Sequence, residues 1–124
     1  MKPKKYEKYK GSEENLQKAV ARYLDRLGVL WFHSPNEIRA KPQYLKKRKQ
    51  LGVKSGVPDV CILEPNKDYN GLFIELKVGY NKTSEAQELF LDKLGVRAYK
   101  TLVSYSLDEV IDVVDEYLEL RLKK

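Results

Sequence analysis

The run Gly71-Leu72-Phe73-Ile74-Glu75-Leu76-Lys77-Val78 decides how this chain folds, because it carries two charges inside a stretch that otherwise looks like buried core. Residues two apart in a β-strand point to the same face, so the run predicts a strand with Glu75 and Lys77 side by side. Burying a charge costs free energy unless the charge is paired or binds a metal. The pair therefore indicates a site, although an ion-pair ladder at a sheet edge is the plainer alternative.

A second apolar run, Val60-Cys61-Ile62-Leu63, begins directly after Gly56-Val57-Pro58-Asp59. If the two runs pair as neighbouring strands, Asp59 lies beside Glu75. Two carboxylates and a lysine at neighbouring strand ends suit a hard divalent cation and an activated water. Pro58 and Gly56 have simpler explanations as a strand start and a turn residue.

The other elements follow from hydrophobic periodicity and capping residues. The sequence predicts helices over 12–27, 84–94 and 107–121, and strands over 29–33, 59–63, 72–78 and 99–103. Ser12 and Ser84 are the expected N-caps, and Gly28 and Gly95 the expected ends of the first two helices. Leu89, Phe90 and Leu94 are expected on the apolar face of the second helix, and Trp31 and Phe32 in the core.

This order predicts an α/β (α+β) fold in one domain, residues 1–124. The first three strands can form an antiparallel meander, and the helix at 84–94 can bring the fourth strand alongside in parallel. The result is a small mixed sheet flanked by helices, with an α-β-β-β-α-β core and an extra C-terminal helix. Residues 1–11 are expected to be a loose basic arm, and residues 34–57 a basic loop with a short helical turn around 43–51.

Charge is distributed unevenly along the chain. Residues 1–55 contain 15 Lys and Arg against 5 Asp and Glu, whereas residues 56–124 contain 9 against 13. Seven of the basic residues fall between Arg39 and Lys54. A polyanion such as DNA or RNA is the natural partner of such a patch, and a solvated surface loop is the plain alternative.

Several classes of protein are disfavoured. No apolar run reaches the roughly 18 residues of a membrane span, and the basic N-terminus has no apolar segment after it, unlike a secretory signal. The single cysteine, Cys61, is expected to be a buried, inert thiol. We expect a cytoplasmic protein without membrane association. The single histidine, His33, is expected to have a structural role at a strand end.

The sequence resembles the PD-(D/E)XK nuclease superfamily and, within it, the virus-type replication-repair nuclease (VRR-NUC) family. The resemblance spans roughly residues 12–118 and is carried by Glu13 or Glu14 ahead of Leu16-Gln17, by Pro35-Asn36-Glu37 with Arg39, by the run from Gly52 to Asp59, by Glu75-Leu76-Lys77, and by Ser84-Glu85-Ala86-Gln87. Each motif alone is weak, and the ordered set is specific. The predicted element order matches that superfamily's core.

The resemblance implies a role for each matching residue. Asp59 and Glu75, with the main-chain carbonyl of Leu76, would bind Mg²⁺ or Mn²⁺. Lys77 would orient or deprotonate the attacking water, or stabilise the phosphorane. Gln87 would point into the site, and it is also the capping-box partner of the serine three residues before it.

An acid of the first helix would hold a second ion or a water. Glu13 precedes Gln17 by four residues and Val20 by seven, so it lies nearer the buried stripe than Glu14, which is the alternative. The expected DNA contacts are Asn36, Arg39, Lys46, Lys47, Arg48 and Lys54.

These features predict a metal-dependent, structure-specific DNA endonuclease of the stand-alone phage or bacterial type. The resemblance further implies a homodimer that acts on four-way junctions in the manner of a Holliday-junction resolvase. Flapped, nicked or linear duplex DNA remain alternative substrates. A DNA-binding module without hydrolytic activity, or a structural partner protein, is the alternative outside the enzyme class.

Overall fold

The structure is a computed structural model of the chain, and it describes residues 5–35 and 41–121. Its elements, in chain order, are α1 (Glu13–Leu27), β1 (Trp31–His33), α2 (Pro42–Gln50), β2 (Val60–Ile62), β3 (Leu72–Leu76), α3 (Glu85–Val96), β4 (Lys100–Ser104) and α4 (Leu107–Glu119). The predicted fold class and element order are confirmed. The ends of the predicted helices and strands differ from the observed ones by at most two residues.

The four strands form one sheet in the order β1-β2-β3-β4. β1 and β2 pair antiparallel, as do β2 and β3, whereas β3 and β4 pair parallel. Parallel neighbours need a crossover connection, and α3 supplies it. The expected antiparallel meander and helical crossover are therefore both confirmed.

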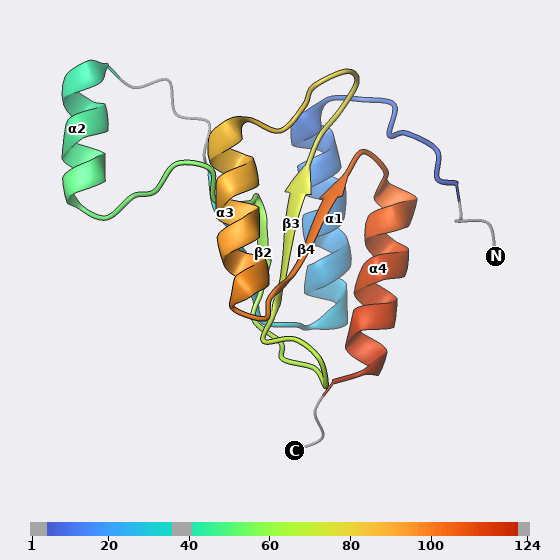
Figure 1. Cartoon of the computed structure of the whole chain (residues 1–124). Helices are drawn as coiled ribbons and strands as arrows, with labels where there is room; N and C mark the ends of the chain where they lie inside the picture. Colours follow the sequence, from blue (N-terminus) through green and yellow to red (C-terminus); the bar gives the residue numbers. More distant parts are fainter. Residues whose placement is uncertain (1–4, 36–40, 122–124) are drawn as a thin grey trace.

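The alternation of side chains along β3 gives the sheet two different faces. Leu72, Ile74 and Leu76 point into the core with the apolar stripes of α1 and α4. Phe73 and Glu75 alternate with these residues and so point the other way. α3 covers that face of the sheet (Figure 1). On that face the ring of Phe73 meets Tyr99 edge-on, with centroids 5.3 Å apart. Glu75 is thus buried on the α3 face and not in the main core.

Three expectations about apolar residues and helix ends are wrong. α3 runs through Gly95 to Val96, because the glycine keeps helical geometry and the chain turns only at the following residues. Leu89 is 55% exposed, because α3 buries only a small part of its surface, at Leu94. Phe32 is 49% exposed because β1 lies at the opposite edge of the sheet from β4, on which α3 packs.

The N-terminal segment is fixed in place over residues 5–11. Tyr9 donates its backbone N–H to the carbonyl of Tyr105 at 2.7 Å and packs against the core. The hydroxyl of Tyr6 donates to Asp112 at 3.1 Å. The prediction of a loose arm is wrong for this part, because tyrosines between the lysines give it apolar contacts; residues 1–4 lie outside the described chain.

α2 is a full helix where only a short turn was expected. Proline at its first position suits a helix start, since the missing N–H has no partner there. The helix buries none of its residues and stands apart from the body of the molecule (Figure 1). Across the described ranges, no helix is both long and apolar enough to span a membrane.

Candidate metal centre

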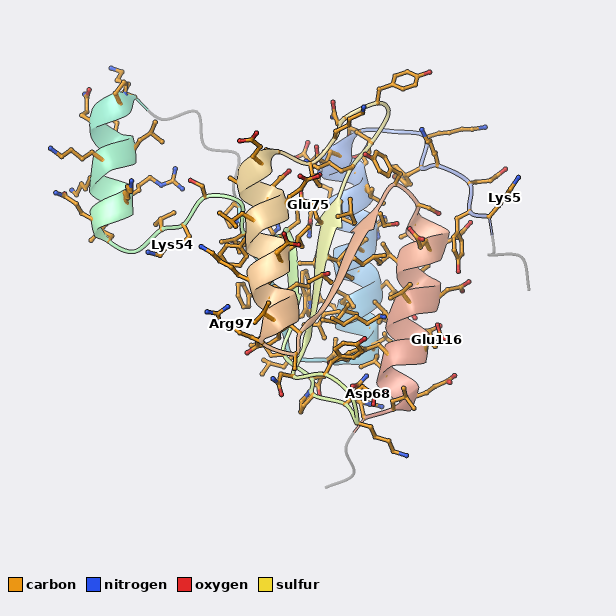
Figure 2. The ribbon with its side chains drawn as sticks, viewed as in Figure 1. Lys5, Lys54, Asp68, Glu75, Arg97 and Glu116 are labelled. Atoms are coloured by element: carbon orange, nitrogen blue, oxygen red, sulfur yellow. The ribbon has the colours of Figure 1, made fainter. Side chains whose placement is uncertain are left out.

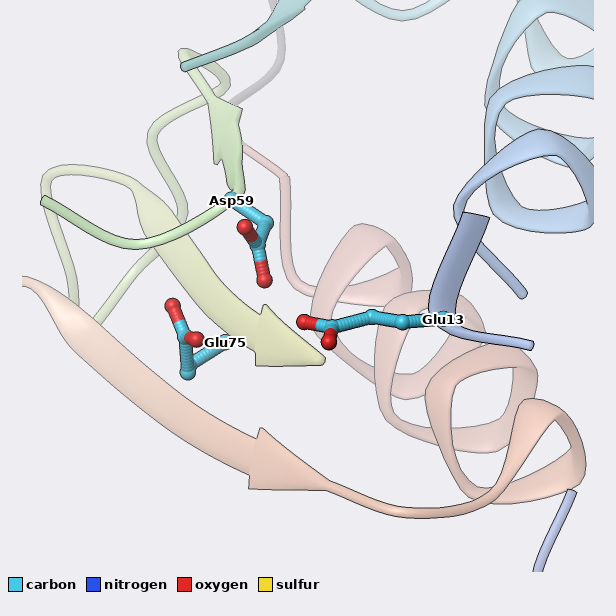
Figure 3. A group of neighbouring side chains, drawn as sticks. All are labelled: Glu13, Asp59 and Glu75. Atoms are coloured by element: carbon cyan, nitrogen blue, oxygen red, sulfur yellow. The ribbon is translucent and has the colours of Figure 1, made fainter. Parts of the chain in front are cut away.

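Three carboxylates from distant parts of the chain meet at one end of the sheet (Figure 3). The antiparallel register pairs Val60 with Ile74, so continuing it by one residue brings Asp59 opposite Glu75. Glu13 is the first residue of α1, whose N-cap Ser12 accepts a hydrogen bond from the backbone three residues on. One oxygen from each of the three carboxylates lies within 4.8 Å of the others.

The structure brings Glu13, and not Glu14, into this cluster. Glu14 is rotated about 100° around the helix, as consecutive residues of an α-helix are. It points to solvent and pairs with Lys18, one turn along, at 3.9 Å. The two adjacent acids therefore have different surroundings.

Glu75 is the most buried member, with 2% of its surface exposed. Figure 2 labels its position in the molecule. Its Oε2 accepts a hydrogen bond from Nε2 of Gln87 at 2.9 Å and pairs with Nζ of Lys77 at 3.2 Å. Its Oε1 is buried with no hydrogen-bond partner among the described residues. Burial, with the nearby charge of Asp59, raises the pKa of Glu75 to about 7.

Asp59 is held by the backbone on both sides. Its Oδ2 accepts from the N–H of Leu76 at 2.9 Å. Its main-chain carbonyl accepts from the N–H of Ser34 at 2.9 Å and lies 2.8 Å from Nδ1 of His33. Burial raises the pKa of Asp59, and the Leu76 N–H and the charges of His33 and Lys77 partly offset that rise. Its carboxylate is therefore fixed in direction and costly to ionise without a cation.

Gln87 links the start of α3 to the carboxylates. Its Oε1 accepts from the N–H of Ser84 at 2.8 Å and its own N–H donates to the Ser84 hydroxyl at 3.2 Å, which completes a capping box. Its amide nitrogen remains available and donates to Glu75. One side chain thus caps the helix and orients a carboxylate.

The basic segment, which is the basic loop predicted over residues 34–57, ends with Gly56 packed against α3. Gly56 has a φ of +80°, and a Cβ there would lie 2.4 Å from the carbonyl oxygen of Ala86. Only glycine permits both this backbone conformation and this close approach. The segment that leads into Asp59 is therefore packed against the first turn of α3.

The surroundings of the three carboxylates fit a divalent cation. Three acids converge, two of them carry raised pKa values, and one buried oxygen of Glu75 has no hydrogen-bond partner among residues 5–35 and 41–121. Such an arrangement is unfavourable without a positive charge, and Lys77 alone contacts only one oxygen of Glu75. All-oxygen donors are the set that Mg²⁺ and Mn²⁺ prefer.

A hollow of about 520 Å³ opens beside the cluster, between the start of α1 and the ends of β1 and β2. Sequence reasoning missed two residues that line it, Gln17 and His33. Gln17 lies one helical turn after Glu13, and its amide nitrogen is buried without a partner in the described chain. Helical spacing could have indicated Gln17, whereas only the pairing of β1 with β2 brings His33 beside Asp59.

The expected DNA contacts are only partly described. Lys46, Lys47 and Arg48 lie on α2 and Lys54 on the segment after it (Figure 2). All are exposed except Arg48, which is half-buried. Asn36 and Arg39 lie outside the described residues. Cys61 is fully buried, and burial raises the pKa of its thiol to about 12, as expected for an inert cysteine.

Comparison with known proteins gives a consistent result. The sequence model of the VRR-NUC domain family matches residues 9–106. A solved VRR_NUC domain protein is 30% identical, with a TM-score of 0.75 over 90% of this chain and 93% of that one. A second, described as a VRR_NUC domain, is 20% identical with a TM-score of 0.57 over 85% and 96%, which supports the fold alone. No match was found among curated proteins.

Proposed function

The chain belongs to the VRR-NUC family and has a nuclease-type function, and on that premise we propose that it is an Mg²⁺- or Mn²⁺-dependent endonuclease that hydrolyses phosphodiester bonds of branched DNA. The observation that carries the proposal is the convergence of Glu13, Asp59 and Glu75 with a lysine and an amide in contact with the most buried of them.

In this proposal the three carboxylates and the carbonyl of Leu76 hold the cation. When bound, the cation activates a water and neutralises charge that develops on the phosphate. Asp59 is kept in position by the N–H of Leu76, and Glu75 by the amide of Gln87. These fixed donors mean that little reorganisation is needed when substrate arrives.

Lys77 has the second chemical role. The side chain of Lys77 is almost fully buried, and its Nζ pairs with Glu75 at 3.2 Å. It orients the attacking water or stabilises the negative charge on the phosphate as the new P–O bond forms and the old one breaks. The leaving oxygen takes its proton from solvent.

The basic segment supplies binding to the DNA backbone. α2 buries none of its residues, Lys54 is exposed, and the chain runs on from them to Asp59. Contacts with phosphates position a substrate and read little sequence. We therefore propose binding that depends on DNA shape and on salt, with Asn36 and Arg39 as further contacts. Such an enzyme would act in the cytoplasm of a bacterium or of a phage-infected cell.

A homodimer would present two such sites to a four-way junction, as a Holliday-junction resolvase requires. The apolar stripe of α4 is already used, because Val110, Val114 and Tyr117 are buried in the core. β4 is an edge strand of the described sheet. We therefore propose the β4 edge as the dimer contact, which light scattering of the purified protein would test.

The decisive experiment is nicking of a synthetic four-way junction in Mg²⁺ or Mn²⁺, alongside flapped, nicked and linear duplexes. Glu13→Gln should reduce the rate by about 100-fold or more, in the range reported for groups that act directly in catalysis. Glu14→Gln is the matched control, one residue away and outside the cluster, and should cost little.

Undiminished cleavage by Asp59→Ala or Lys77→Ala would reject the mechanism. Tight DNA binding without cleavage in any divalent metal would instead support a binding module that lacks hydrolysis. Preferred cleavage of flaps or nicks over the junction would retain the chemistry and replace the proposed substrate.

A further inference from the structure

A second group of side chains lies at the same end of the molecule and has no part in the metal chemistry. Tyr80 is 97% exposed and stands three residues after Lys77. It follows Gly79, whose φ of +59° lies in a region that residues with a side chain rarely adopt. The turn is closed by a hydrogen bond, which the N–H of Asn81 donates to the carbonyl of Val78 at 3.2 Å. The ring of Tyr80 is therefore open to solvent in the turn that follows β3 and Lys77.

The ring is held from one side by the N-terminal segment. Nζ of Lys8 lies 5.5 Å from the centroid of the Tyr80 ring and 5.5 Å from that of Tyr105. A cation at this distance is attracted to the face of an aromatic ring. Tyr105 also donates its hydroxyl to the carbonyl of Asn81, in the same turn. The N-terminal segment, the turn at residues 78–81 and the chain just after β4 are therefore in mutual contact.

A single exposed apolar side chain needs no explanation, because many occur on protein surfaces. Tyr80 differs in that its turn is fixed by hydrogen bonds and a cation contacts it, while nearly all of its surface remains open. Lys82, two residues on, is exposed as well, and Lys10 extends the positive charge along the N-terminal segment. An open aromatic ring with a cation over it, and further exposed lysines nearby in the chain, suits a flat, uncharged group joined to phosphates.

We propose that Tyr80, flanked by Lys8 and Lys82, is a stacking platform for an unpaired base of the DNA substrate. This inference rests on the proposed nuclease function and deepens it, since it names the feature of the DNA that the enzyme recognises. A base inside a continuous duplex has both faces covered by its neighbours, whereas a base at a branch point, flap or gap has a free face. Stacking on aromatic side chains tolerates any base because every base has a π-face.

The same geometry explains why the platform belongs to the cleavage reaction. The turn follows directly from β3, which carries Glu75, and it leads into α3, which carries Gln87. Along the chain, Tyr80 therefore stands between two groups of the proposed site, Glu75 before it and Gln87 after it. Recognition of an unpaired base and selection of the bond to be cut become one event.

The test uses 2-aminopurine, whose fluorescence falls when it stacks on an aromatic ring, and full-length protein in Ca²⁺ with gels to verify that the DNA stays intact. One DNA carries the probe at an unpaired position next to a branch, and the other carries it inside a blunt duplex. The variants are Tyr80→Ala, Tyr80→Phe and Lys8→Ala. Val96→Ala, exposed at the far end of α3, is the control.

Wild-type protein should quench the probe at the branch and not in the duplex. Tyr80→Ala should abolish the quenching and weaken binding of the branched DNA by about tenfold, within the range known for single base–aromatic stacks. It should leave duplex binding unchanged, and Tyr80→Phe should retain the wild-type behaviour. Lys8→Ala should weaken binding of the branched DNA less than Tyr80→Ala does.

Unchanged quenching in Tyr80→Ala, or equal weakening for both DNAs, overturns the stacking platform. If Tyr80→Ala behaves in this way while the wild-type enzyme still cleaves DNA, the platform fails and the nuclease stands. If the wild-type enzyme cleaves no DNA in any divalent metal, the proposed function itself fails.

Discussion

The buried carboxyl of Glu75 predicts that the metal-free fold loses stability as pH rises. With its pKa raised from 4.5 to about 7, Glu75 binds a proton more tightly in the folded chain than in the unfolded one. Below about pH 4 the carboxyl is protonated in both the folded and the unfolded chain, so it does not change the free energy of unfolding. Above its folded pKa it is ionised in both, and the folded state alone bears the cost of the buried charge.

The size of the effect follows from the two pKa values. The interval between 4.5 and about 7 corresponds to a loss of about 3 kcal/mol in the free energy of unfolding, complete by about pH 8. Glu75→Gln removes the ionisation and keeps the shape of the side chain. The variant should therefore gain about 3 kcal/mol relative to wild type between about pH 4.5 and pH 8.

Urea unfolding in EDTA, followed by circular dichroism across this pH range, measures the effect. Any pH-independent loss of stability caused by the substitution, such as the lost contact with Lys77, shifts the whole curve of unfolding free energy against pH and leaves its slope unchanged. Glu14→Gln, at an exposed position, should follow the wild-type curve. Parallel curves for wild type and Glu75→Gln would refute the reasoning, because they would mean that the fold does not disfavour the ionised carboxylate.

Adding the cation completes this test. At pH 7.5, Mg²⁺ or Mn²⁺ at 100 times its dissociation constant should raise wild-type stability by about 2.7 kcal/mol. Glu75→Gln should respond much less, because one of the proposed ligands is gone. Equal stabilisation of both proteins would remove Glu75 from the metal site.

Three further predictions concern residues around the site. Gly56→Ala should destabilise the fold by about 2 kcal/mol or more in urea unfolding, whereas Gly52→Ala, also at positive φ but with nothing within 4 Å, should cost only the backbone strain; equal losses would show that the contact with α3 is unimportant. Gln87→Glu keeps the capping box but replaces the amide that donates to Glu75, so it should lower the cleavage rate about 10- to 100-fold, as loss of a supporting contact typically does; wild-type activity would leave capping as its only role. Replacing Lys46, Lys47 and Lys49 by serine should reduce the slope of log K against log salt by up to about 3, and an unchanged slope would mean that α2 does not contact phosphates.

Local rules predicted most of the fold. Serine caps, the left-handed glycine after α1 and the alternation in β3 identified the elements and the order of their pairing. They failed where packing between distant segments decides the outcome. Gly95 stays helical and Leu89 stays exposed because α3 covers only part of one face, and neither fact is visible in the periodicity of the helix itself.

The sequence also predicted which carboxylates would lie together. The placement of Asp59 beside Glu75 follows from strand pairing, and the spacing of α1 favoured Glu13 over Glu14. His33 joins the hollow only because β1 pairs with β2 in a particular register, and the sequence of one strand does not encode its register with another. Likewise, no local signal indicates that the N-terminal segment packs against Tyr105.

α2 has a consequence for how such a protein can change over generations. Since none of its residues is buried, substitutions there escape the constraints of packing that hold the rest of the chain. Variants could exchange this helix for one of different charge or length and acquire a different preference for nucleic-acid geometry. The hydrophobic core and the acidic cluster would be unchanged, which makes residues 41–54 a natural place to graft new binding properties if α2 contacts DNA as proposed.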